Sequence, residues 1–446
     1  MEERGQWGSQ LGFILASTGS AVGLGNVWRF PYLVGENGGA AFVVIYLFFV
    51  LVIATPCIFA EFALGRYTQK NPVGAITKIR PGSPFKYVGI LGVITGVGIL
   101  SFYGIISGWI VGFIIKTATK SHMGFTEFVS DPLSVLMLFA FFLLLNVIIV
   151  YKGIAGGIER WSKILMPLLF ILLVALIIYA NTLEGSSEGL IFYLVPDFNK
   201  VTSSTFLSAL GQAFFSLSLG MGVMITYGSY LPKTSNMFSS AIYIALADTL
   251  IAFMAGLIIF PALFAMGENP ACGPTLIFVV FPKLFNIMPG GIIVGVVFFI
   301  LLSIAALTST ISLLEVPVAY FVDERKAKRK NIIWWVSGAA FLLGIPSALS
   351  QGSSEFFTKF GLFPSYLCSA DFLSQISFLF GDLSLVIGSF LGTIFIGWVW
   401  GAKNAAAELE IGSPYFKYFK LPWVYLIRYF IPVVIFLIFL NLFRIF

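Results

Sequence analysis

Four side chains able to do chemistry stand inside long apolar stretches of this sequence: Asn26, Arg29, Glu61 and Asp248. A charged group in an apolar medium is costly unless it is paired with another group or used to bind something. Carboxylate and amide oxygens suit hard cations, and a guanidinium suits a carboxylate. These side chains therefore favour the binding of ions and a small polar solute over simple helix packing.

The sequence contains few residues that could carry out covalent catalysis. The single histidine, His122, falls in a predicted loop, and no nucleophile, base and acid stand at a recognisable spacing. Cys57, Cys272 and Cys368 are too scattered for a disulfide framework or a metal site, although a bridge between Cys272 and Cys368 in predicted outer loops is left open. The sequence predicts a protein that is not an enzyme and has no covalent cofactor.

Hydrophobic helices must position these polar residues. Of the 446 residues 59% are hydrophobic and 10% are charged, whereas a soluble domain carries about 25% charge. Apolar stretches of about twenty residues recur, and each is long enough to cross a hydrocarbon core about 30 Å thick. The sequence predicts an all-α integral membrane protein with about eleven spans in the lipid bilayer, at 11–36, 40–64, 87–116, 133–151, 160–181, 205–230, 238–264, 291–321, 332–350, 378–401 and 422–443.

Basic residues predict the orientation of the chain. They cluster on one side, for example at Arg66 to Lys86 and Arg325 to Lys330, and the positive-inside rule makes that side cytoplasmic. The N-terminus is then cytoplasmic, and the short termini favour the plasma (inner) membrane of a prokaryote. Because the basic residues of the predicted cytoplasmic loops account for the net charge of +6, this charge does not indicate nucleic-acid binding. No polar linker separates soluble domains, so residues 1–446 form one transmembrane domain.

Small and polar residues interrupt two predicted spans near their centres, at Gly19 to Asn26 in the first and at Ser216 to Gly222 in the sixth. A backbone that breaks inside a membrane must satisfy its freed amides and carbonyls on something polar, which in transporters is substrate and ions. Glycine-mediated helix packing is the alternative, but it does not explain the charges. The separation of five spans predicts two repeats, about 8–181 and 205–402, with an additional helix at about 422–443.

Five motifs in order along the chain resemble the neurotransmitter:sodium symporter family, and the resemblance runs from Trp7 to about Arg428. It implies a five-plus-five inverted repeat with broken helices 1 and 6, and a sodium-coupled symporter of amino acids that works by alternating access. The family usually has twelve spans, and this chain lacks the twelfth, as some prokaryotic members do. The motifs are Gly23 to Pro31, Glu36 to Gly39, Glu61 to Arg66, Gly157 to Arg160 and Ala306 to Ser309.

The resemblance also assigns a substrate site between the two breaks. The amides of Leu24 and Gly25 and the Tyr103 hydroxyl would hold a carboxylate, which suits the positive end of a half-helix. The amine would be held by the carbonyls of Ala21, Phe215 and Ser216 and the hydroxyl of Ser218. The side-chain pocket would be formed by Ser20, Ile99, Phe215, Met221, Ser309 and Leu313.

Two features bear on the substrate. Family transporters of monoamines have an aspartate where this chain has Gly23, which favours an amino acid with its own carboxylate. The motif Gly220-Met221-Gly222 resembles members that accept bulky hydrophobic or aromatic amino acids. Simple packing of Met221 is the alternative role for that residue, and the alternative substrate is another amino-acid derivative or an osmolyte.

Sodium prefers oxygen ligands, and the resemblance implies two sodium sites. Site one would use Ala21, Asn26, Ser216, Asp248 and the substrate carboxylate, so that each ligand raises the affinity of the other. Site two would use Gly19, Val22, Ala305, Thr308 and Ser309, although a Thr-Ser pair in a membrane helix often bonds its own backbone. Asp248 lies beside the family's chloride position, near Tyr46, Gln212 and Ser216, and we therefore expect independence from chloride.

The resemblance places a gate on each side of this site. On the inner side, Arg4 would pair with Asp323, and Trp7 would close the path as an apolar plug. On the outer side, Arg29 lies with Tyr103 and Phe215, but alignment puts Ser377 where its acidic partner should be. Asp371 and Asp382 flank that position, and the choice between them stays open, as does the oligomeric state.

Overall fold

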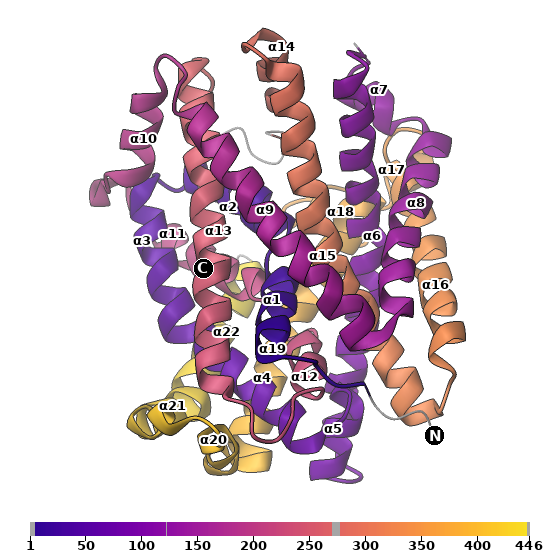
Figure 1. Cartoon of the computed structure of the whole chain (residues 1–446), viewed down its shortest axis with the longest axis vertical. Helices are drawn as coiled ribbons and strands as arrows, with labels where there is room; N and C mark the ends of the chain where they lie inside the picture. Colours follow the sequence, from indigo (N-terminus) through magenta and orange to yellow (C-terminus); the bar gives the residue numbers. More distant parts are fainter. Residues whose placement is uncertain (1–4, 122, 270–276, 444–446) are drawn as a thin grey trace.

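The computed structural model describes residues 5–121, 123–269 and 277–443. Every regular element of these residues is a helix, and the long helices run side by side through the height of the molecule (Figure 1). Large apolar side chains cover the outer surface, among them Ile293 and Trp335, which are 72% and 76% exposed. Such a surface suits lipid rather than water. The prediction of an all-α membrane protein is confirmed.

Nine runs of helix in the described residues are long and apolar enough to cross a membrane: Ala40–Thr68, Lys86–Ala118, Pro132–Tyr151, Ile154–Ala180, Met237–Ala265, Gly291–Arg325, Arg329–Leu349, Phe372–Glu410 and Lys420–Leu442. A tenth is the pair Gln10–Ala21 and Gly25–Glu36, bent by 51° at its break. The remaining predicted span, the sixth at 205–230, consists of α11 (Ser203–Ser216) and α12 (Val223–Gly228), each too short to cross alone. The breaks in the first and sixth predicted spans are therefore present.

Several spans contain short π-helical turns between α-helical pieces; the label η marks these turns and also the two 3-10 helices η4 and η8 outside the spans. The elements of the spans are α1 (Gln10–Ala21), η1 (Gly25–Arg29), α2 (Phe30–Glu36), α3 (Ala40–Phe49), η2 (Val50–Ala54), α4 (Thr55–Thr68), α6 (Lys86–Ala118), α8 (Pro132–Tyr151), η3 (Ile154–Glu159), α9 (Arg160–Ala180), α13 (Met237–Ala265), α15 (Gly291–Arg325), α16 (Arg329–Leu349), α18 (Phe372–Ser377), η6 (Phe378–Leu383), α19 (Ser384–Ile394), η7 (Phe395–Gly401), α20 (Ala402–Glu410), α21 (Lys420–Tyr425), η9 (Leu426–Phe430) and α22 (Ile431–Leu442).

Short helices cap the bundle between the spans. The largest difference from the predicted spans is at the tenth, which runs over Phe372–Glu410 instead of 378–401. The connecting helices are α5 (Pro72–Ile79), α7 (Phe125–Val129), α10 (Ser186–Leu194), η4 (Phe198–Lys200), α14 (Val280–Ile287), α17 (Glu355–Thr358) and η8 (Pro414–Tyr418).

The broken helix α1 lies at the centre of the bundle, where it packs against α9, α13 and α15 (Figure 1). The half-helix α12 packs against α4, and small residues allow this close approach. A Cβ atom on Gly65 would collide with the carbonyl of Ile225, and one on Gly228 would lie 3.0 Å from the backbone of Phe62. The surrounding helices thus hold both breaks in the middle of the molecule.

Two buried ion pairs join helices far apart in the sequence. Arg66 donates from Nε to Glu408 Oε1 at 2.8 Å, and its guanidinium also reaches the carbonyl of Ser235 at 2.6 Å. Arg329 pairs with the fully buried Glu315 at 2.5 Å. Buried charges of this kind need such partners, because each is costly to remove from water. They tie α4 to α20 and α16 to α15.

Candidate functional site

The first break follows Ala21, where α1 ends with Val22 in an extended conformation (φ −70°, ψ 110°). The second break covers residues 217–222, where Gly220 and Gly222 have φ values of 79° and 77°. Glycine takes this left-handed conformation without steric cost, which explains both glycines of the Gly-Met-Gly motif. Ser218 also has a positive φ, 54°, although it carries a side chain. Backbone groups that an intact helix would use are free at both breaks.

Side chains from several helices satisfy these freed groups. The carbonyl of Ser20 accepts hydrogen bonds from the hydroxyls of Ser218 at 3.1 Å and Ser309 at 3.2 Å. The amide of Leu24 donates to the Tyr103 hydroxyl at 2.7 Å. Gln212 donates to the carbonyl of Gly25 at 3.0 Å. The two breaks are therefore adjacent, and the hydroxyls between them are flexible partners that a polar solute could replace.

A cluster of buried oxygens lies next to the breaks. Asn26 Nδ2 donates to Asp248 Oδ1 at 2.7 Å and to Ser216 Oγ at 3.1 Å. Ser216 Oγ in turn donates to Asp248 Oδ2 at 2.6 Å, and Tyr46 donates to Ser216 Oγ at 3.3 Å. Asn26 and Asp248 are fully buried. The side chains predicted for sodium site one thus meet at one point, from η1, α11 and α13.

The chemistry of this cluster suits a cation. The Asp248 carboxylate receives hydrogen bonds only from neutral groups, and the ion pairs of the described residues do not include it. A buried carboxylate without a basic partner is stabilised by a bound cation or by a proton. Its oxygen neighbours are the ligand type that hard cations prefer. The cluster can therefore hold a sodium ion as cargo.

An enclosed cavity of about 40 Å³ lies between the breaks and the helices α6 and α15. Its lining is mostly apolar, with the hydroxyls of Tyr103, Ser218 and Ser309 as polar groups. A cavity of this size holds only a few waters, so a larger solute requires the surrounding helices to move apart. The residues that line it are Ala21, Gly23, Gly25, Ile99, Phe102, Tyr103, Phe215, Ser218, Met221, Ser309 and Leu313.

Most of the residues predicted for the substrate site line this cavity, and three are placed differently. Ser20 turns its hydroxyl to Ser312 at 2.6 Å, Ser216 turns toward Asp248, and Leu24 contributes its amide to Tyr103. Phe102 was missed by the sequence reasoning. Its position three residues after Ile99 and next to Tyr103, on one turn of helix, was the signal that could have found it.

The residues predicted for sodium site two lie where α1 passes α15. A Cβ atom on Gly19 would lie 3.0 Å from Thr308 Cβ, so the helices touch at this point. The Thr308 hydroxyl donates to the carbonyls of Ile304 and Ala305, both at 3.1 Å, which is the backbone bonding weighed as the alternative. Ser309 donates to Ser20 rather than toward Val22. The sodium role of these residues stays a prediction.

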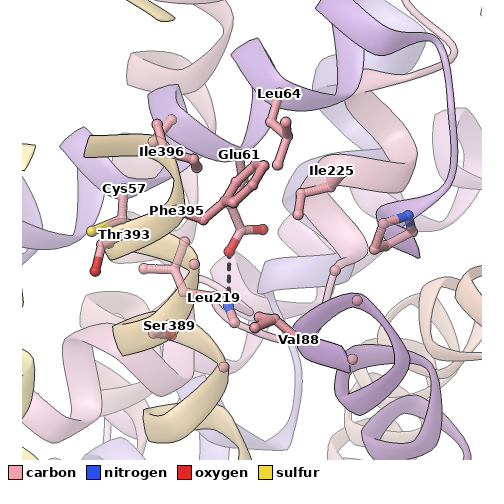
Figure 2. Close-up of a pocket in the computed structure, with 18 of the residues that line it drawn as sticks. Cys57, Glu61, Leu64, Val88, Leu219, Ile225, Ser389, Thr393, Phe395 and Ile396 are labelled. Carbon is pink, nitrogen blue, oxygen red and sulfur yellow. Dashed lines mark hydrogen bonds between the residues drawn. The ribbon is translucent and has the colours of Figure 1, made fainter. Parts of the chain in front are cut away.

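Glu61 does not join the oxygen cluster around Asp248. It accepts a hydrogen bond from the backbone amide of Gly220 at 2.8 Å, shown as the dashed line in Figure 2. Figure 2 shows its carboxylate in a separate pocket, with Leu219 and Val88 on one side and Phe395 on the other. Glu61 therefore lies apart from the oxygen cluster and supports the second break from α4.

An ion pair lies on the side of the cavity that is predicted to face outward. Arg29 Nη2 lies 3.3 Å from Asp382 Oδ1, and the guanidinium stacks over the Phe215 ring at 4.5 Å. Asp371, the other candidate, caps α18 by accepting from the amide of Ser374 at 3.0 Å. The structure thus selects Asp382, five residues beyond the aligned Ser377. Asp382 lies in the π-helical turn η6, and counting residues alone could not choose between the two aspartates.

On the side predicted to face inward, Trp7 is buried against the ring of Tyr227 and donates from Nε1 to the Tyr227 carbonyl at 2.9 Å. Asp323 accepts from the backbone amide of Asn71 at 3.0 Å and from its side chain at 3.2 Å. The predicted partner of Asp323, Arg4, lies outside the described residues, as do His122 and Cys272. The inner ion pair therefore stays a prediction.

Comparison with known proteins connects this geometry to a family. A family profile described as "Sodium:neurotransmitter symporter family" matches residues 4–126 and 120–445. An uncharacterized sodium-dependent transporter of Bacillus subtilis, YhdH, is 39% identical over 98% of this chain and 97% of its own. One from Haemophilus influenzae is 36% identical over 99% and 98%. The sodium-dependent serotonin transporter of Drosophila melanogaster is 25% identical, over 95% and 74%.

A solved structure shares the fold. It is a crystal structure of MhsT in complex with L-phenylalanine, with a TM-score of 0.87 and 43% identity. The match covers 98% of this chain and 100% of the other.

Proposed function

Because this chain belongs to the sodium:neurotransmitter symporter family and is a sodium-dependent transporter rather than an enzyme, we propose that it carries bulky hydrophobic or aromatic L-amino acids together with sodium. The transport follows alternating access around the site between the two breaks. The five-plus-five arrangement, with repeats at about 8–181 and 205–402, places one break in each repeat. The observation that carries the proposal is the cluster of Asn26, Ser216 and Asp248 beside an apolar cavity.

The surroundings of Gly23 support an amino acid as the substrate. A Cβ atom at this position would lie 2.7 Å from the Tyr103 hydroxyl, so an aspartate here would have to displace Tyr103. Without a carboxylate of its own at this point, the site relies on the one that the substrate brings. The amide of Leu24, now bonded to Tyr103, is the first group that this carboxylate would meet.

The cavity lining supports a bulky hydrophobic side chain. Ile99, Met221 and Leu313 are apolar, and methionine adapts to ligands of different shape. The homologous structure with L-phenylalanine bound is consistent with such a ligand in this fold. The cavity is smaller than such a side chain, so binding must begin from a state in which the Arg29 to Asp382 pair has opened. This pair serves as the outer gate, and Trp7 with Asp323 as the inner one.

We expect two sodium ions in each cycle. The first would bind at Asn26, Ser216, Asp248 and the carbonyl of Ala21, in contact with the substrate carboxylate. The bound sodium ion and the bound substrate then raise each other's affinity by the same free energy. The second would bind between α1 and α15 after Thr308 and Ser309 turn their hydroxyl oxygens from backbone carbonyls toward the ion. The protein acts in the plasma (inner) membrane, with its N-terminus in the cytoplasm.

The proposal is tested by uptake of labelled leucine, tyrosine, phenylalanine and tryptophan into proteoliposomes, with and without an inward sodium gradient. We expect uptake only with the gradient, and at least a tenfold loss in Asn26→Ala. Asn199→Ala, at an exposed asparagine in the short helix η4, is the matched control and should transport normally. If these amino acids fail and betaine or another osmolyte is taken up with sodium, the alternative substrate class is correct and the proposed one is wrong.

Chloride independence follows from the position of Asp248. Ser216 and Tyr46, which lie near the family's chloride position, are already bonded into the cluster with the Asp248 carboxylate. A second anion there would be repelled by this fixed charge. We expect the same rate of sodium-driven uptake when chloride is replaced by gluconate on both sides of the membrane. A loss of more than half of the rate would contradict this role for Asp248.

A further inference from the structure

Arg428, inside the eleventh predicted span, has no acidic partner in the described residues. Arg29, Arg66 and Arg329 each pair with a carboxylate. The ion pairs of the described residues do not include Arg428, in η9, and its Nε is buried without a hydrogen-bond partner. An arginine in an apolar medium is costly unless another group balances its charge, and no carboxylate of the described residues does so for Arg428.

Arg428 lies at an open groove on the outer face of the bundle. The groove has a volume of about 610 Å³ and runs between the tenth and eleventh predicted spans. Its walls are almost wholly apolar and aromatic, and several of their side chains are about half exposed. They include Phe390, Ile394 and Trp398 on one side and Tyr429, Val433 and Phe436 on the other.

Aromatic rings hold the guanidinium in place. Its carbon lies 4.4 Å from the centre of the Trp398 ring and 5.4 Å from that of Tyr429. Trp398 is itself fixed, because its Nε1 donates to the Arg428 carbonyl at 2.9 Å. Cation–π contacts lower the cost of the charge without neutralising it, and they leave guanidinium N–H groups for an anion. The groove thus combines an oriented cation with a long apolar trough.

The depth of this cation matches a lipid headgroup. Arg428 is eight residues into the span Lys420–Leu442, about 12 Å along the helix from its start. A long arginine side chain can reach from this depth toward the headgroup layer. The span starts at the end of the molecule that carries α5, α20 and α21, at the bottom of Figure 1. The predicted orientation assigns this end to the cytoplasmic leaflet.

We propose that the groove between η7–α19 and η9–α22 is a binding site for one anionic phospholipid, whose phosphate pairs with Arg428 and whose acyl chain lies along Val433 and Phe436. The phosphate and the guanidinium match in charge and in their bidentate hydrogen-bonding geometry. A zwitterionic lipid fits the trough equally well but brings its own cation to the phosphate. The site therefore selects the headgroup by charge, and it does not depend on the identity of the transported solute.

Native mass spectrometry of the full chain, titrated with phosphatidylglycerol or phosphatidylcholine of the same acyl chains, tests this site. We expect one phosphatidylglycerol to be retained at least tenfold more tightly than phosphatidylcholine. Arg428→Gln should lose this preference. Arg80→Gln removes the same charge from an exposed position at the same end of the molecule and should keep it. Equal retention by Arg428→Gln and the native chain would overturn the proposal.

Two further substitutions test the apolar trough and the charge separately. Val433→Trp fills the trough but leaves Arg428 in place, and it should weaken phosphatidylglycerol retention while the thermal midpoint in detergent stays unchanged. Arg428→Lys retains the charge and should restore part of the preference. If either groove variant changed the oligomeric state instead of the lipid retained, the groove would be an interface between two copies and the lipid site would be wrong.

Discussion

Replacing Asp248 with asparagine is expected to lower the apparent affinity for sodium by about 100-fold, which corresponds to about 2.7 kcal/mol. The substitution keeps the size of the side chain and its bond to Asn26, but it removes the charge that faces the ion. Asp248 is fully buried, and opposite charges about 4 Å apart interact by about 4 kcal/mol at an effective dielectric of 20. The measurement is sodium-dependent uptake, or substrate binding, as a function of sodium concentration.

Asp197→Asn is the matched control. Asp197 is a half-exposed aspartate that caps η4 by accepting from Asn199 at 3.1 Å and forms a surface pair with Lys200 at 3.7 Å, so its loss should leave the sodium dependence unchanged. A reduced maximum rate with an unchanged sodium affinity in Asp248→Asn would argue against an ion at this carboxylate. It would place the role of Asp248 in a conformational step.

Replacing Arg66 with methionine is expected to destabilise the protein by about 3–5 kcal/mol, because it leaves a buried carboxylate without its partner. Arg66 is fully buried, and it bonds to Glu408 and to the carbonyls of Ser235 and Ile411. Methionine replaces the stem of the side chain but none of its donors. The thermal midpoint in detergent should fall markedly, and it can be followed by the loss of monodisperse protein after heating.

A double substitution separates the charge from the packing at this site. Arg66→Met combined with Glu408→Leu removes both charges, and part of the lost stability should return, since no unpaired charge remains. Lys359→Met breaks the exposed pair with Glu355 and should change stability by less than about 1 kcal/mol. If Arg66→Met were as mild as Lys359→Met, the buried pair would not be what holds α4 to α20.

The two broken helices are linked through hydrogen bonds to the same aspartate, Asp248. Asn26 stands on η1, just after the first break, and Ser216 ends α11, just before the second. Both bond to Asp248 on α13, which is a continuous helix. An ion at this cluster would therefore stabilise one relative position of both breaks against an intact neighbour. The same three side chains thus connect both breaks.

Much of this protein could be predicted from local properties of its sequence. Apolar stretches of sufficient length identify spans, because a bilayer of fixed thickness requires a helix of fixed minimum length. The breaks around Val22 and at 217–222 were visible because small residues interrupt otherwise apolar segments. Asn26 and Asp248 could be identified because a polar group in an apolar segment is costly unless it binds a partner. These features depend only on residues that are neighbours in the chain.

What the tertiary structure decided are partners that are distant in sequence. It selected Asp382 over Asp371 for Arg29, and it separated Glu61 from the oxygen cluster by pairing it with the amide of Gly220. It also placed Trp398 beside Arg428, two residues that no local pattern connects. Composition identifies the groups that must avoid lipid, because the free energy of moving a polar or charged group from water into lipid depends on that group alone. The partner that satisfies each group depends on how helices tilt, break and pack, and the energy of those contacts exists only once the chain has folded.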